Sequence, residues 1–308
     1  MAETMATRQA YGKTLIELGE KYPQLVVMDA DLSKSTMTAE FGKTYPDRFF
    51  NMGIAEQNLY GAAAGLALSG KIVCASTFAM FATGRAFEII RNSIGYTRAN
   101  VKICATHAGI TVGEDGASHQ TFEDIALMRT IPGMTVINPS DGVSAKKLLE
   151  QVVAMEGPCY VRLGRAKVPV FYEDSDQLTL GRGNLVKDGK DVTIVATGIM
   201  VSEAMAAAEK LKEDGIDARI IDIHTIKPID EEILIKAAQE TGAIVTAEEH
   251  SIIGGLGSAV AEVIVKNCPV KMAMVGQKDT YGESGKPDEL KKKYGMTAED
   301  IEAAVKKL

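Results

Sequence analysis

The sequence predicts an α/β fold of two domains, each a mostly parallel sheet flanked by helices. Short apolar, β-branched runs alternate with longer helical patterns, which is typical of β-α-β units. Most of these runs are apolar at every position, as strands buried on both faces are. The alternation lapses once, in a polar and turn-rich stretch, and then begins again. A chain of 308 residues with 46% hydrophobic content can bury the cores of two domains.

The first domain is predicted over residues 1–170. Its strands are expected at QLVVMDADL, KIVCAST, VKICATH, MTVINPS and PCYVRLGR. Helical patterns separate them at GIAEQNLYGAAAGLAL, TGRAFEIIRNSIGY, TFEDIALMRTI and SDGVSAKKLLEQVVAM. Ser140 opens the last of these patterns and is expected to be its N-cap.

A linker is predicted over residues 171–189, and the second domain over residues 190–308. Its strands are expected at VTIVATG, ARIIDIHTIKP, AIVTAEEH and VKMAMVG. The helical pattern VSEAMAAAEKLKEDG follows the first of them, and Gly215 is a plausible stop for that helix.

Composition excludes several classes of function. Lys and Arg total 34 against 41 Asp and Glu, a net charge of -7, which disfavours nucleic acid and anionic membranes as partners. No apolar run approaches the roughly 18 to 20 residues of a membrane span. The N-terminal stretch lacks the apolar segment of a signal peptide. Four widely spaced cysteines without a C-x-x-C pair resemble buried thiols. The prediction is a cytoplasmic protein without a metal site of its own.

The densest polar cluster is ATHAGITVGEDGASHQTFED, between a predicted strand and a predicted helix. It holds His107 and His119, with Glu114 and Asp115 between them. Ligands of open α/β sheets bind at the carboxyl ends of strands, where this loop is expected. Histidine suits proton transfer near neutral pH, and a carboxylate can orient it or bind a hydroxyl. Ordinary loop and capping roles are the alternative, and the histidine spacing fits no zinc ligand pair.

Phenylalanines stand out in STFAMFATGRAFE, because aromatic residues make up only 6% of the chain. Phe78, Phe81 and Phe87 fit a core at a strand-to-helix junction. A stacking wall for a planar heterocycle is the functional alternative.

Cations for a phosphate group are available near the ends of predicted elements. The candidates are Arg8, Arg85, Arg162 and Arg165. Ser35 lies in a polar stretch, DADLSKSTMT, that follows a strand and is either a turn or a site wall. The alternative for each arginine is a solvated or ion-paired side chain.

Three other features are assigned to packing. GGLGSAVAE lacks the G-x-G-x-x-G spacing of a nucleotide loop and is interpreted as a packed apolar helix. His224 and His250 are assigned to domain or interface packing.

Glu56 is the least expected residue of the first domain. It stands in MGIAEQN, ahead of the Gly/Ala-rich stretch LYGAAAGLALSGK, and has no basic neighbour downstream until Lys71. A surface ion pair is therefore not the obvious explanation for it.

The segments FFNMGIAEQNLYGAAAGLALSGKIVCASTFAMF, THAGITVGEDGASHQTFEDIALMRTIPGMTVINPSD, VTIVATG and IIDIHTIKPID resemble the pyrimidine-binding and C-terminal domains of transketolase. The similarity extends in order over essentially the whole chain. The G-D-G motif, which holds Mg2+ and the cofactor diphosphate in this family, does not occur. The resemblance therefore implies the C-terminal subunit of a split transketolase, without the diphosphate-binding domain.

The resemblance also implies a role for each candidate residue. Glu56 would hydrogen-bond N1′ of the thiamine aminopyrimidine, and a carboxyl in apolar surroundings can share a proton with a ring nitrogen. Phe78 and Phe81 resemble the wall that stacks on this ring, whereas Gly84 replaces a third aromatic residue that Phe87 could compensate. Roles in the substrate channel fall to the remaining candidates: His107, Asp115 and His119 near the reacting carbons, and Arg8, Ser35 and Arg165 at the sugar phosphate.

The implied reaction transfers a two-carbon ketol unit from a ketose phosphate to an aldose phosphate. The implied cofactors are thiamine diphosphate and Mg2+ (or Ca2+), the metal being held mainly by a separate N-terminal subunit, in an α2β2 assembly. Alternatives are a 1-deoxyxylulose-5-phosphate synthase-like subunit, a 2-oxo acid dehydrogenase E1 beta-like subunit, and a non-catalytic scaffold of the same fold.

Overall fold

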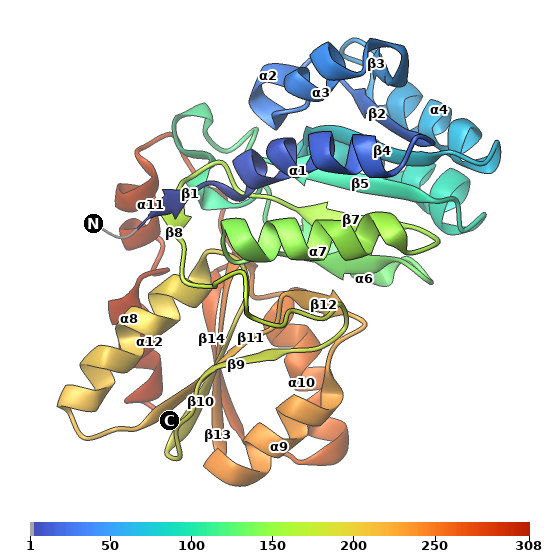
Figure 1. Ribbon diagram of the computed structural model, residues 1–308. Coiled ribbons are helices and arrows are strands. Elements are labelled where there is room, and N and C mark those ends of the chain that lie inside the picture. The colour runs from blue at the N-terminus through green and yellow to red at the C-terminus, as the bar shows by residue number, and fades with distance from the viewer. Residues whose placement is uncertain (1–2) are drawn as a thin grey trace.

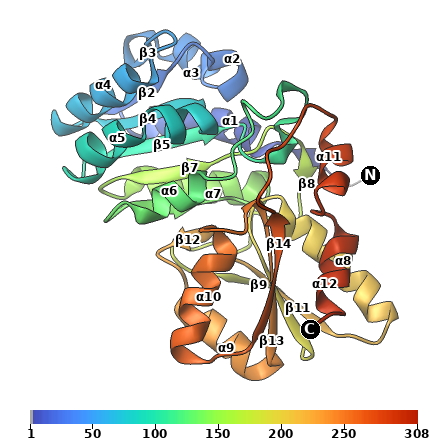
Figure 2. The ribbon, with the colours of Figure 1, turned by 180° about the vertical axis from the view of Figure 1, so that it is seen from behind.

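Three sheets organise residues 3–308, the part of the chain that the computed structural model describes. Figures 1 and 2 show the two larger sheets one above the other, each with helices on both faces. The predicted α/β class with two layered units is confirmed. Residues 1–2 of the predicted first domain lie outside the described residues.

The first sheet has seven strands in the order β12-β6-β7-β5-β4-β2-β3. All its neighbours are parallel except β12 and β6. Its strands are β2 (Leu25–Asp29), β3 (Phe49–Asn51), β4 (Ile72–Phe78), β5 (Val101–Thr106), β6 (Thr135–Ile137), β7 (Cys159–Arg162) and β12 (Thr225–Lys227). The central strands β2, β4, β5 and β7 are buried at every residue, which explains their continuous apolar runs.

Helices cover both faces of this sheet. The longer ones are α1 (Thr7–Lys21) and α7 (Gly142–Ala154) on one face, and α4 (Glu56–Leu68) and α6 (Asp124–Thr130) on the other (Figures 1 and 2). Short elements fill the connections: α2 (Ser33–Thr36), α3 (Ala39–Thr44), η1 (Pro46–Arg48), η2 (Phe81–Arg85), α5 (Phe87–Ile89), η3 (Ile90–Gly95) and η4 (Ile110–Asp115). The expected single helix over 83–96 is instead interrupted by two π-helical segments, η2 and η3.

The second sheet has five strands in the order β14-β13-β10-β11-β9, and only β9 runs antiparallel to its neighbour. Its strands are β9 (Asn184–Lys187), β10 (Val192–Ala196), β11 (Ala218–Asp222), β13 (Ala243–Ser251) and β14 (Lys271–Gln277). Its helices are α8 (Met200–Glu213), α9 (Glu231–Thr241), α10 (Leu256–Asn267), α11 (Pro287–Lys293) and α12 (Ala298–Val305). A small third sheet pairs β1 (Thr4–Met5) with β8 (Val168–Pro169). The predicted linker thus contains the edge strand β9.

The predicted strand ARIIDIHTIKP is wrong as a single element, because it contributes to two sheets. Its first half, β11, ends at Asp222, whose carboxylate accepts the hydroxyls of Ser140 (2.6 Å) and Tyr172 (3.1 Å). The carbonyl of His224 then accepts the backbone N–H of Asn138 (2.8 Å), which brings the chain to the edge of the first sheet. The second half, β12, completes that sheet.

The predicted N-cap at Ser140 is also wrong. Asp141 caps α7, since its Oδ1 accepts the N–H of Ser144 at 2.8 Å. The Ser140 hydroxyl is engaged by Asp222 instead. At the end of α8, Gly215 has φ +79° and its N–H bonds the carbonyl of Lys212, which confirms it as the stop.

One hydrophobic core continues from the first sheet into the second. The same cluster joins Ile103 and Met128, in the unit built around the first sheet, to Val195 and Ile221, in the unit built around the second. Three of the four cysteines are buried, and none of the four is in a disulfide. Across residues 3–308, the longest apolar helical stretch falls short of what a bilayer crossing needs.

Candidate active site

Glu56 begins α4 and is 3% exposed. Its atom Oε2 is buried and has no hydrogen-bond partner within residues 3–308. The N-terminal end of a helix favours a negative charge, but an unpaired buried oxygen still costs about 1–3 kcal/mol. A buried polar atom without a partner is rare in folded chains. The position therefore suits a ligand that supplies a hydrogen-bond donor.

Four rings come together next to this helix. Phe78 ends β4, and its ring lies 3.8 Å from that of His107 and 6.0 Å from that of Phe81, centroid to centroid. His119 meets the ring of Phe81 edge-on at 5.2 Å. The side chain of Gln57 donates to the carbonyl of Arg85 (3.4 Å), so the start of α4 lies against η2, the element that begins at Phe81.

Gly84 stands where the resemblance places a third aromatic residue, and Phe87 was expected to fill the space. The structure fills it with a different side chain. A side chain at Gly84 would begin 2.5 Å from the methyl group of Met80. Phe87 packs against the hydrophobic core of the first unit. Met80, rather than Phe87, occupies the space that Gly84 leaves.

His107 follows β5 in a left-handed conformation, with φ +58°. Its Nδ1 lies 2.9 Å from the hydroxyl of Thr106. Burial lowers the pKa of His107 to about 3, and the charges of Arg8, Arg165 and His119 add to the shift. The imidazole is therefore neutral at physiological pH and can donate or accept a hydrogen bond without carrying charge.

The loop after His107 carries the other polar candidates. His119 is half-buried, with Nδ1 3.0 Å from the hydroxyl of Ser118. Asp115 ends η4 and is exposed. Gly109, Gly113 and Gly116 all have positive φ, which a residue with a side chain rarely adopts. These glycines explain how the loop folds back over the rings.

Two of the predicted cations lie near His107. Arg8 donates to the carbonyl of Ser35 at 2.6 Å, and Arg165 donates to the carbonyl of Val112 at 2.7 Å. Arg165 also pairs with Glu114 at 2.8 Å. Burial lowers the pKa of Arg8, and the charge of Arg165 lowers it further. Two guanidinium groups that repel each other make this region suitable for an anion.

Arg162 is excluded as a phosphate ligand. It is buried and pairs with Asp124, with Nε 2.7 Å from Oδ2. It also donates to the carbonyl of Glu249 (2.8 Å) and so links the two units. Arg85 is exposed at the end of η2, and its backbone carbonyl accepts the side-chain N–H of Gln57.

The packing roles of His224 and His250 are confirmed. Both are fully buried, and burial lowers the pKa of each to about 4. His250 accepts the N–H of Ala126 at 3.4 Å, and the carbonyl of His224 bonds Asn138, so both lie between the units. GGLGSAVAE opens α10, whose apolar side is buried as expected.

Sequence reasoning assigned no role to Gln120 and Glu249, which both contact the polar loop. Gln120 donates to the carbonyl of Ile110 (3.3 Å), and Glu249 accepts the N–H of Thr111 (2.6 Å). The sequence did contain an indication of a role for Glu249, because AEEH places two acidic residues in an otherwise apolar strand.

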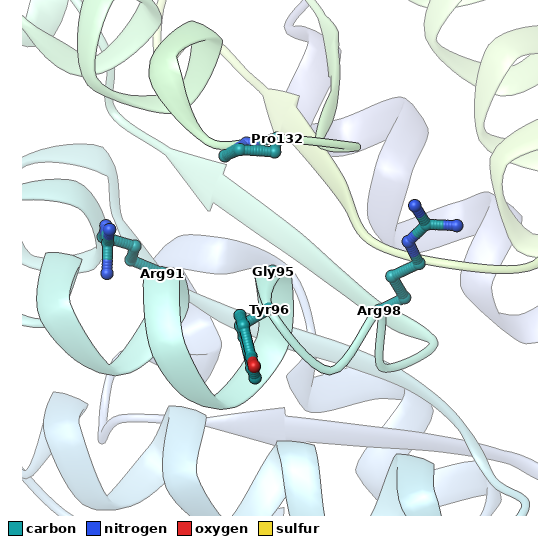
Figure 3. Close-up of a pocket in the computed structure, with 5 residues that line it drawn as sticks. All are labelled: Arg91, Gly95, Tyr96, Arg98 and Pro132. Atoms are coloured by element: carbon teal, nitrogen blue, oxygen red, sulfur yellow. The ribbon is translucent and has the colours of Figure 1, made fainter.

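A separate cavity of about 270 Å³ lies at the end of η3 (Figure 3). Its lining residues are Arg91, Gly95, Tyr96, Arg98 and Pro132. The two arginines lie on either side of Tyr96 rather than converging, and none of the candidate site residues lines this cavity. It is not part of the candidate site.

The depressed pKa of His107 predicts a specific acid sensitivity. An unfolded histidine titrates near 6.5, so below about pH 6.5 the unfolded chain binds a proton that the folded chain does not. The stability contributed by neutral His107 is complete above this pH and is lost as pH falls toward 3. Between pH 7.5 and pH 5 we expect the free energy of unfolding in urea to fall by about 2 kcal/mol more in wild type than in His107→Asn.

The control for this experiment is Ile110→Val, a change in the same loop that titrates nothing. The free energy of unfolding of this variant should depend on pH as that of wild type does. Equal pH dependence of wild type and His107→Asn would show that His107 is not held neutral by the fold.

Comparison with known families identifies the two units. The description "Transketolase, pyrimidine binding domain" matches residues 3–170, and "Transketolase, C-terminal domain" matches residues 181–301. The two matched domains define a protein of the thiamine diphosphate-dependent class. The chain belongs to the transketolase family.

Relatives of similar length are named as a section or a subunit of a transketolase. A transketolase C-terminal section of Methanocaldococcus jannaschii is 57% identical over 297 residues, covering 96% of this chain and 93% of the relative. A 6-deoxy-6-sulfo-D-fructose transketolase subunit of a Clostridium species is 44% identical over 294 residues, covering 96% and 91%. The solved structure of a split-gene transketolase, an inactive beta4 tetramer, has a TM-score of 0.93 at 56% identity and covers 98% of both chains.

Proposed function

We propose that this chain is the C-terminal subunit of a two-chain transketolase that moves a two-carbon ketol unit from a ketose phosphate to an aldose phosphate. The observation that carries the proposal is the buried Oε2 of Glu56, which has no partner within residues 3–308 and stands at the start of a helix that lies against η2, the element that begins at Phe81. The residues present fit the aminopyrimidine half of thiamine diphosphate. When bound, this cofactor supplies the electron sink for carbon–carbon bond cleavage.

Glu56 would hold the pyrimidine nitrogen and keep a proton on it, because its Oε2 has no competing donor within residues 3–308. Phe78 and Phe81, stacked at an interplanar angle of 17°, would line one side of the ring. Burial in this apolar setting excludes water from the carboxyl and strengthens its hydrogen bond.

The sugar phosphate would bind over His107, Asp115 and His119. Neutral His107 and half-buried His119 can hydrogen-bond substrate hydroxyls and move protons, and Asp115 can accept a hydroxyl. Arg8, Ser35 and Arg165 would hold the phosphate, since an anion would relieve the repulsion between the two arginines.

The diphosphate and Mg2+ (or Ca2+) would be held by a separate N-terminal subunit, because the sequence contains no G-D-G motif. We propose an α2β2 assembly. The relative whose beta chains alone form an inactive tetramer supports the need for such a partner. We further propose residues 1–170, 171–189 and 190–308 as first domain, linker and second domain, and the cytoplasm as the compartment, in keeping with four free thiols.

Reconstitution tests this function. The chain is purified alone and with a candidate N-terminal subunit, and mass and activity are measured with thiamine diphosphate and Mg2+. With xylulose 5-phosphate and ribose 5-phosphate, we expect the complex to be active and the isolated chain to be at least about a hundredfold slower, because it cannot hold the cofactor beside Glu56.

Other outcomes select the alternatives. Turnover of pyruvate with glyceraldehyde 3-phosphate would indicate a 1-deoxyxylulose-5-phosphate synthase-like subunit, and decarboxylation of a 2-oxo acid an E1 beta-like one. Full activity of the isolated chain would contradict the split enzyme. A stable complex that is inactive with every pair would support a scaffold.

A further inference from the structure

The polar loop between His107 and His119 is held by the second unit at two hydrogen bonds. Glu249, on β13, accepts the backbone N–H of Thr111 with Oε1 at 2.6 Å. Gln120, at the other end of the loop, donates to the carbonyl of Glu283 at 3.0 Å. Both partners come from the second unit, although the loop belongs to the first. The loop is thus fixed from outside near the start of η4 and just after His119.

Close packing at glycines reinforces these bonds. A side chain at Gly109 would overlap the carboxyl group of Glu249, and one at Gly116 would begin 2.5 Å from the hydroxyl of Ser284. Gly113 faces Pro287, whose nearest atom would lie 3.2 Å from an added Cβ. The three glycines of the loop therefore fit against Glu249 and against the segment 282–287. Each of them has positive φ, so the contact fixes a backbone that is otherwise free to vary.

Glu249 is itself well supported. It is 3% exposed, and its own carbonyl accepts Nη2 of Arg162 at 2.8 Å. Arg162 is in turn paired with buried Asp124. Burying a carboxylate is costly unless it is hydrogen-bonded, and the acceptor role toward Thr111 offsets that cost. The cost would be unnecessary if this residue only filled space.

We propose that Glu249 and the segment 282–287 are positioning elements that hold the loop of His107, Asp115 and His119 in the geometry needed to bind the donor substrate. This inference rests on the proposed function of that loop. It gives the second unit a part in substrate binding, whereas Glu56, Phe78 and Phe81 lie on elements outside the loop. We call Glu249 and the segment 282–287 the brace. Affinity for the substrate should therefore depend on the brace, whereas contact with the cofactor should not.

The first test needs no catalysis. Hydrogen exchange of the amides of residues 109–116 is measured in the full chain for wild type and for Glu249→Ala. Because Thr111 loses its acceptor, we expect its amide to exchange at least about tenfold faster in the variant. Glu249→Gln keeps an acceptor oxygen and should restore most of the protection. Unchanged exchange in Glu249→Ala would overturn the proposal.

The second test uses the reconstituted complex. For Glu249→Ala we expect KM for the donor sugar phosphate to rise about tenfold, with a smaller fall in kcat because the loop also carries His107 and His119, while the affinity for thiamine diphosphate stays near wild type. Gly282→Ala provides an independent variant, because its methyl group would push against the side-chain oxygen of Gln120. It should raise KM in the same way if Glu249→Ala does not fold.

Glu289→Gln is the matched control. It removes an exposed carboxylate of α11 whose ion pair with Lys286, at 3.9 Å, is long and exposed to solvent, so the variant should behave as wild type. Equal losses of kcat and cofactor affinity in Glu249→Ala would indicate general disruption and overturn the positioning role. If the wild-type complex turns over no sugar phosphate, the proposed function fails, while the exchange experiment still decides whether the brace exists.

Discussion

Glu56→Gln in the reconstituted complex is expected to lower turnover by about a hundredfold or more. Loss of a positioned acid–base group typically costs this much, and an amide cannot hold a proton on the pyrimidine nitrogen as a carboxyl group does. The measurement is kcat with saturating sugar phosphates and cofactor. Turnover at the wild-type level would remove Glu56 as the cofactor-activating residue.

The same substitution should stabilise the isolated chain. Replacing a buried carboxyl group whose Oε2 has no partner within residues 3–308 by an amide relieves part of its desolvation cost, and we expect the free energy of unfolding in urea to rise by about 1 kcal/mol. A residue that weakens the fold but is needed for activity is the signature of a functional site.

Glu248→Gln provides the contrast, because this buried carboxylate is satisfied. It accepts the N–H groups of Leu256 (2.6 Å) and Gly257 (2.8 Å) at the start of α10. At pH 8, above the pKa of about 7 to which burial raises it, the substitution should cost about 1 kcal/mol. Equal effects of the two substitutions would contradict the distinction between a satisfied and an unsatisfied carboxylate.

Phe78→Ala is expected to destabilise the chain by about 3 kcal/mol. The ring is 7% exposed and stacks on His107, and truncating a buried phenylalanine leaves a cavity that the surroundings refill only in part. Urea unfolding measures the loss. Phe78→Leu, which keeps most of the apolar volume, should cost less than about 1.5 kcal/mol.

A second effect of Phe78→Ala would appear at His107. Burial is the main cause of its low pKa, so removing the covering ring should raise that pKa toward the ordinary range, as NMR titration of the imidazole can follow. An unchanged pKa would mean that other groups, and not Phe78, keep water from His107.

The β-α-β order was predictable because buried parallel strands must be apolar on both faces, and helices must cover them. This logic succeeded for β4, β5, β7, β10 and β13. It failed at ARIIDIHTIKP, where the apolar pattern continues while the chain changes sheets. The bonds from Ser140 and Tyr172 to Asp222 that accompany this change join residues 50 to 82 positions apart, which no local pattern contains.

The candidate residues could be selected from the sequence because their types are unusual where they occur. Glu56 had no nearby cation, the phenylalanines were scarce, and two histidines shared one glycine-rich loop. Arg162 was chosen on the same grounds as Arg8 and Arg165 and is excluded by its partner Asp124. A side chain's availability depends on what lies next to it, and that neighbour is often distant in sequence.

The sequence by itself determined the α/β class, the order of most elements and, through the family segments and the missing G-D-G motif, the kind of enzyme to which the chain belongs. Only the tertiary structure decided that Oε2 of Glu56 is buried without a partner among residues 3–308, that Phe78 stacks on His107, and that Glu249 accepts a hydrogen bond from the loop. Secondary structure follows from the local periodicity of apolar residues. Burial, pairing and ring contacts arise between residues far apart in the chain, and these become neighbours only when the two sheets pack together.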